Sequence, residues 1–85
     1  MQVGTQFTGS VAPSSTGRWF THSWPAAWDV VWTVVSDSPQ PGAPQVQWDV
    51  QVERSSADLI SYWINVTNLT GNTVSIEARY AVLNI

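Results

Sequence analysis

Hydrophobic and polar residues alternate along much of this chain, and the alternation is clearest between residues 46 and 83. An alternation of period two puts one set of side chains on each face of a β-sheet. The pattern therefore predicts strands over 46–53, 60–67 and 73–82. One face of these strands is aliphatic and the other is polar, with Trp63 as the one large exception on the polar face.

The first half of the chain carries the same kind of pattern, interrupted by turn residues. A strand is predicted over 3–11, but Gly4 and Gly9 weaken it and favour an edge or a bulge. A second predicted strand, over 18–24, has aromatic residues on both faces, so its pattern does not decide which face is buried. A third, over 28–35, is apolar on both faces, and we expect it to be buried on both sides or to lie at a subunit contact.

The spacing of the segments indicates the fold class. Prolines make residues 36–44 a long surface loop. Short strands without a helical period predict an all-β fold, a single small antiparallel β-sandwich or barrel of about six strands. Short connections favour a meander, in which successive strands are neighbours. A chain of 85 residues has room for one such β domain, spanning 1–85.

Composition narrows the classes of partner. The formal net charge is −3, with three arginines and no lysine, whereas nucleic acids and anionic membranes are bound mainly through Lys and Arg. We therefore expect no nucleic-acid partner, and no run approaches the ~20 apolar residues of a membrane span. No signal peptide is visible. If the protein acts outside the cell, we expect either that it leaves by a route without a cleavable leader or that a leader has already been removed.

The polar face of the last three predicted strands is the first candidate site. In a meander, the simplest register places Asp49 and Glu77 on either side of Trp63. An indole stacks on the C–H face of a sugar, and carboxylate, amide and guanidinium groups pair with sugar hydroxyls. The residues predicted for this carbohydrate-binding site are Trp63, Asp49, Glu77, Asn65, Gln47 and Arg79. The alternative is that Trp63 packs under a loop or against a second subunit.

A second candidate site surrounds the bend that Pro25 makes after the second predicted strand. Aromatic and polar residues gather there, and we expect some of them to rim a groove at the end of the fold. These residues are Trp24, Trp28, His22, Asp29 and Trp19. The alternative for Trp24 and Trp28 is a place in the core, as we expect for Trp32 and Trp48, which lie among valines.

Motifs for catalysis and metal binding are missing. His22 is the only histidine, there is no cysteine, and no serine has the context of an activated nucleophile. Asp49 and Glu77, the carboxylates considered for glycoside hydrolysis, would lie on a flat sheet face without a cleft. We therefore expect neither enzymatic activity nor a bound metal or cofactor.

The partner that fits this surface is a neutral, hydroxyl-rich ligand. A short, tryptophan-rich, cysteine-free β domain resembles several small sugar-binding proteins in composition. The sequence favours a non-catalytic carbohydrate-binding, lectin-like module that homo-oligomerisation makes multivalent. The alternative is a structural or assembly subunit whose exposed tryptophans form protein–protein interfaces.

Overall fold

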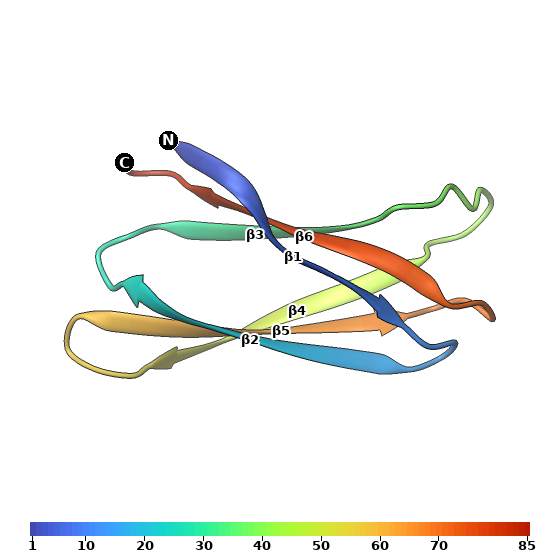
Figure 1. The fold of residues 1–85 in the computed structure, drawn as a ribbon, viewed down its shortest axis with the longest axis horizontal. Coiled ribbons are helices and arrows are strands. Elements are labelled where there is room, and N and C mark those ends of the chain that lie inside the picture. Colours follow the sequence, from blue (N-terminus) through green and yellow to red (C-terminus); the bar gives the residue numbers. More distant parts are fainter.

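The computed structural model describes residues 1–85 and contains six antiparallel β-strands and no helix. The strands are β1 (Gln2–Val11), β2 (Thr16–Pro25), β3 (Val30–Ser36), β4 (Val46–Arg54), β5 (Leu59–Asn68) and β6 (Val74–Val82). They form two three-stranded sheets, in the orders β1-β6-β3 and β2-β5-β4, which lie one above the other in Figure 1. The prediction of a small all-β fold is confirmed, and the structure offers no long apolar helix that could span a bilayer.

The chain changes sheet at four of its five connections, and only β4 and β5 form a hairpin within one sheet. The expected pairing of β5 with β6 is therefore wrong, because β6 lies between β1 and β3 in the other sheet. Both edges of β5 are already occupied, by β2 and β4. A short connection after β5 can cross to the opposite sheet as easily as it can turn back, and sequence spacing does not distinguish these paths.

Asn68, at the end of β5, fixes this crossing. Its buried amide nitrogen donates hydrogen bonds to the carbonyl oxygens of Val11, Ala12 and Asn72 at 3.0, 3.2 and 2.7 Å. Its oxygen accepts a bond of 2.9 Å from the backbone N–H of Thr70. A buried amide that is fully paired stabilises one arrangement of the backbone around it. Asn68 thus ties the turn after β1 to the loop after β5.

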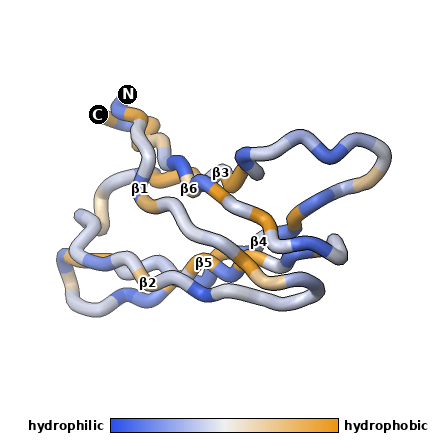
Figure 2. The backbone as a smooth tube through the Cα atoms, turned by 45° about the vertical axis from the view of Figure 1, so that its right-hand side comes forward, coloured by the Kyte–Doolittle hydropathy of each residue, from blue (hydrophilic) through white to orange (hydrophobic).

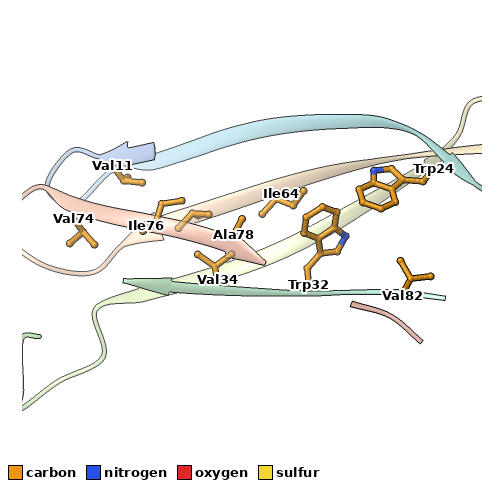
Figure 3. Close-up of a cluster of buried hydrophobic side chains, with 10 residues drawn as sticks. Val11, Trp24, Trp32, Val34, Ile64, Val74, Ile76, Ala78 and Val82 are labelled. Carbon is orange, nitrogen blue, oxygen red and sulfur yellow. The ribbon is translucent and has the colours of Figure 1, made fainter. Parts of the chain in front are cut away.

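The core fills the space between the sheets and changes from aliphatic at one end to aromatic at the other (Figure 3). The central strands provide the completely buried side chains, which include Ile64 and Val66 of β5 and Ile76, Ala78 and Val82 of β6. At the aromatic end, Trp24 meets Trp32 edge to face, with 5.6 Å between the ring centroids. The prediction that Trp32 belongs to the core is confirmed.

A β-bulge in β2 decides which of its aromatic residues is buried. The register shifts between Thr21 and Trp24, and Ser23 has a left-handed φ of 66°. The inserted residues turn Trp24 onto the inward face with Thr21, whose hydroxyl accepts a hydrogen bond of 3.0 Å from the indole N–H. His22 stays beside Phe20, outside the core, with 5.5 Å between their rings.

A second bulge reverses the faces of β1. The register shifts between Thr5 and Phe7, so that Val3 points outward and is exposed while Phe7 packs on the core. The expectation of an edge strand or a bulge over residues 3–11 is therefore confirmed, since β1 is both an edge strand and bulged. Phe7 stacks on Trp19 of β2, with 5.1 Å between the ring centroids. This pair closes one side of the sandwich.

The opposite side of the sandwich, along β3 and β4, is less well covered. Trp48 faces inward, across from Val66, but 38% of its surface is exposed. The prediction of Trp48 as a core residue is wrong, because the facing sheet does not cover this edge strand. The loop between β3 and β4, residues 37–45, extends beyond the sheets, and its trace is mostly hydrophilic (Figure 2). This segment confirms the predicted surface loop.

Two glycines make room for the Trp19 ring. A Cβ atom placed on Gly9 would lie 2.7 Å from the ring of Trp19, and one on Gly17 would lie equally close. Gly9, one of the two glycines that weaken the predicted first strand, is therefore required by the packing between β1 and β2.

We expect Gly9→Ala to lower the free energy of unfolding by about 1–3 kcal/mol, because the new methyl group overpacks against the indole. The measurement is urea denaturation followed by tryptophan fluorescence. The matched control is Gly71→Ala, since a Cβ there meets nothing within 4 Å, and its stability should stay level or rise by about 0.4–1 kcal/mol. Equal stability of the two variants would contradict the close packing of Trp19.

Candidate binding face on the β2-β5-β4 sheet

The outward face of the β2-β5-β4 sheet carries aromatic and polar side chains in ordered rows. The register places Phe20, Trp63 and Gln51 in one row, and Arg18, Asn65 and Asp49 in the next. We name the surface they form, together with His22, the aromatic–amide face. Its members are Arg18, Phe20 and His22 of β2, Trp63 and Asn65 of β5, and Asp49 and Gln51 of β4.

The aromatic part of this face is centred on Phe20 and Trp63. Their ring centroids lie 4.4 Å apart. The imidazole of His22 also stacks on Phe20. The guanidinium of Arg18 lies over the indole of Trp63, 4.4 Å from its centroid. Trp63 faces outward as the alternation predicts, but it is half-buried, whereas Phe20 is 47% exposed. Phe20 therefore offers the more open aromatic surface.

Hydrogen bonds hold the polar side chains next to these rings. The side-chain oxygen Oε1 of Gln51 accepts bonds from Arg18 at 3.3 Å and from Asn65 at 3.2 Å. The same Asn65 nitrogen also lies 3.3 Å from Oδ2 of Asp49. The amide nitrogen of Gln51 and Oδ1 of Asp49 make no hydrogen bond within the chain. The face thus presents a free donor and a free acceptor beside its rings.

The β4–β5 hairpin has the predicted faces but a register shifted by two residues. The simplest register sets Asp49 beside Trp63, whereas the structure pairs Asp49 with Asn65 and Gln51 with Trp63. The reason is the length of the turn, in which the N–H groups of Ser55 and Ser56 both point to the carbonyl oxygen of Leu59. Gln47 shares the outward face, one row beyond Asp49.

Glu77 and Arg79 do not join this face. Both lie on β6, in the other sheet, so the expected row of Asp49, Trp63 and Glu77 is wrong. Arg79 donates a hydrogen bond of 2.6 Å to Glu77, and Thr5 donates another of 2.9 Å to the same oxygen. These bonds, first that from Arg79 and then that from Thr5, lower the pKa of Glu77. The hydrogen bond to Glu77 in turn raises the pKa of Arg79.

The residues of the second candidate site are dispersed. Trp24 belongs to the core, Trp28 packs on it with 6.3 Å between the rings, and Trp19 stacks on Phe7. Asp29 is exposed, and its backbone N–H is bound by Asn84 at 2.9 Å. Only His22 reaches a shared surface, which is the aromatic–amide face. The bulge in β2 causes this separation, because it sends Trp24 inward and leaves His22 outside.

Sequence reasoning missed Phe20, Arg18 and Gln51 as members of the site. Phe20 and Arg18 lie on β2, and the pairing of β2 with β5 joins segments that are more than 30 residues apart in the chain. The only signal was the alternation within residues 18–24, which places Arg18, Phe20 and His22 on one face. Without the bulge, that same face would have included Trp24.

Comparison with protein families, with characterised proteins and with solved structures finds no match to this chain. No residue role is therefore transferred from another protein. The chemistry of the aromatic–amide face itself is therefore what points to a function.

The pKa of Glu77 provides a test of the β6 geometry. We expect Arg79→Gln to raise the pKa of Glu77 towards its usual value, because the strongest hydrogen bond to the carboxylate is weakened. The contribution of this carboxylate to stability is present above its unfolded-state pKa and is lost as the pH falls through its lower folded-state pKa. Carboxyl carbon shifts in an NMR pH titration report the change. Arg18→Gln, on the other sheet, should leave the Glu77 titration unchanged.

Proposed function

We propose that this protein is a non-catalytic, lectin-like module that binds carbohydrate on the aromatic–amide face and becomes multivalent through self-association. The observation that supports this most is the contact between the rings of Phe20 and Trp63, whose centroids lie 4.4 Å apart, within rows of amide and carboxylate groups. Half of Phe20 is open to solvent. An accessible aromatic ring next to fixed polar groups is the combination that a sugar ring requires.

Each part of the face has a role in this proposal. The apolar C–H side of a sugar ring packs on Phe20, in the way that apolar groups pack on an aromatic face. The free amide N–H groups of Gln51 donate to a hydroxyl, and the free oxygen of Asp49 accepts from one. The existing bond from Arg18 to Gln51, at 3.3 Å, sets the orientation of that amide before ligand arrives. Such preorganisation lowers the entropy cost of binding.

The charges on the face favour a neutral ligand. Arg18 and Asp49 lie in the same row, so their charges offset each other. The whole chain contains three arginines and no lysine, which is little for neutralising the phosphates of a nucleic acid. A hydroxyl-rich, uncharged glycan therefore suits this surface better than a polyanion.

The position of the carboxylates supports a binding role rather than catalysis. Glycosidases place two carboxyl groups on either side of the scissile bond, roughly 5–10 Å apart. Asp49 and Glu77, the pair considered for this chemistry, lie on the outward faces of different sheets. The side chain of Glu77 is, moreover, engaged by Arg79 and Thr5.

A different observation favours the second candidate function, that of an assembly subunit. Trp48 and Val52 leave apolar surface exposed along β4, 38% and 64% of each residue respectively. Apolar surface of this kind is typical of protein–protein contacts. The two functions are compatible, because a small flat sugar site binds weakly and gains avidity when several copies are joined.

A fluorescence titration with a panel of neutral glycans tests the proposed function. We expect at least one glycan to change the tryptophan emission, since Trp63 lies in the site. Phe20→Ala and Arg18→Gln should each weaken binding about tenfold or more, because the stacking surface or the orientation of the amide is lost. Both variants retain Trp63 as the reporter.

The matched control is Arg79→Gln, an arginine on the outward face of the other sheet. This variant should bind the glycan with unchanged affinity. An emission that stays flat across the panel, or an equal loss in both arginine variants, would contradict the proposed site.

A further inference from the structure

Strand β4 ends the β2-β5-β4 sheet and has an open edge. It pairs on one side only, with β5, over nine residues from Val46 to Arg54 without a register shift. None of the ten backbone hydrogen bonds outside the strand ladders involves residues 46–54. A straight edge strand with free N–H and C=O groups is a template for another strand.

The other edge strands are less suited to pairing. β1 and β2 each carry a bulge, at Thr5/Phe7 and at Thr21/Trp24, which interrupts a regular ladder. β3 is regular but has only seven residues. Its inward residues Trp32 and Val34 are already buried. β4 is thus the longest regular edge, and the one whose inward face still exposes apolar side chains.

We propose that β4 pairs antiparallel with β4 of a second copy of this chain, about a two-fold axis at Val50. This register uses all nine residues of both strands. It sets Trp48 across from the partner's Val52, and Val52 across from the partner's Trp48. An aromatic residue opposite a β-branched one is a favourable cross-strand pair, and the most exposed apolar side chains of β4 cover each other.

The polar face of β4 fits the same register. Asp49 lies across from the partner's Gln51, and Glu53 across from the partner's Gln47, so each acid meets an amide. The amide nitrogen of Gln51 and Oδ1 of Asp49, which make no bond within one chain, become partners across the axis.

The neighbouring registers that keep the same faces are less favourable. An axis at Gln51 would set Asp49 across from the partner's Glu53. An axis at Asp49 would set Asp49 across from the partner's Asp49. Like charges directly opposite each other destabilise a strand pair. Larger shifts leave five or fewer residues of each strand paired. The arrangement of charges along β4 therefore selects the axis at Val50.

This interface specifies how the proposed lectin-like module becomes multivalent. The biological purpose of the interface rests on that proposed function. The two-fold axis runs perpendicular to the sheet, so both aromatic–amide faces lie on the same side of a continuous six-stranded sheet. The two β5 strands are three strand spacings apart, roughly 14 Å. Two sugar sites at this separation can engage one glycan chain, which raises avidity without a new type of contact.

The test is sedimentation equilibrium without glycan, over concentrations up to the millimolar range. We expect the wild-type chain to dimerise. Gln47→Lys should tighten the dimer, because it faces the partner's Glu53, and Gln47→Glu should weaken it, each by about 2- to 30-fold in Kd. The matched controls are Gln6→Lys and Gln6→Glu, at an exposed glutamine of β1, which change the net charge equally and should leave Kd unchanged.

A second pair of variants distinguishes β4 from β3. Val52→Glu, at the most exposed valine of β4, should disrupt the dimer, whereas Val31→Glu, at an exposed valine of β3, should not. A wild-type monomer at millimolar concentration overturns the proposal, as does a dimer that responds to Gln6 or Val31 in the same way as to Gln47 or Val52. Because no glycan is present, failure of the interface is distinguishable from failure of the sugar site.

Discussion

The packing of β5 against β6 is the interaction on which the rest of this structure depends. No ladder hydrogen bonds join the two sheets, and the chain passes between them four times. The sheets are held together by the inward rows of their central strands, where Ile64, Val66, Ile76 and Ala78 are completely buried. Full burial of a valine or isoleucine side chain contributes about 1.5–3 kcal/mol. Ile64, Val66 and Ile76 therefore each stabilise the contact between the sheets, and together with Ala78 they determine which face of each neighbouring strand points outward.

The aromatic–amide face follows from this constraint. Once Ile64 and Val66 face the core, Trp63 and Asn65 must face solvent, and the register brings Phe20 and Gln51 beside them. The bulge in β2 allows this one strand to contribute to both the core and the outward face. It sends Trp24 into the core while Phe20 stays outside. The left-handed φ of Ser23 is the backbone strain that accompanies this bulge.

Strand positions and faces in the second half of the chain could be predicted from sequence, because alternation has a direct physical cause in the pleat. Strand order could not, because it depends on contacts that alternation does not report. Asn68 illustrates this limit: it appears as one more polar residue at a strand end, yet its bonds to Val11 and Asn72 help to direct the chain across the sandwich. The bulges at Thr5/Phe7 and Thr21/Trp24 set a similar limit, because each reverses a face that period two would keep. Trp63 could be found because the alternation of its own strand shows its face, whereas Phe20 joins the site only through the pairing of β2 with β5, which alternation does not report.

Small sheets have a large share of edge strands, and in this fold four of the six strands are edges. Bulges make two of these edges irregular, and β3 is short, so β4 remains as the long regular one. Two polar residues of β4, Asp49 and Gln51, belong to the aromatic–amide face proposed to bind sugar and also lie beside the free edge. Gln51 is already bound by Arg18 and Asn65 through its oxygen, which leaves its nitrogen to either a ligand or a second chain. The amide nitrogen of Gln51 carries two hydrogens, so a ligand and a second chain can each accept one. The two proposed processes share this donor and are expected to be thermodynamically coupled.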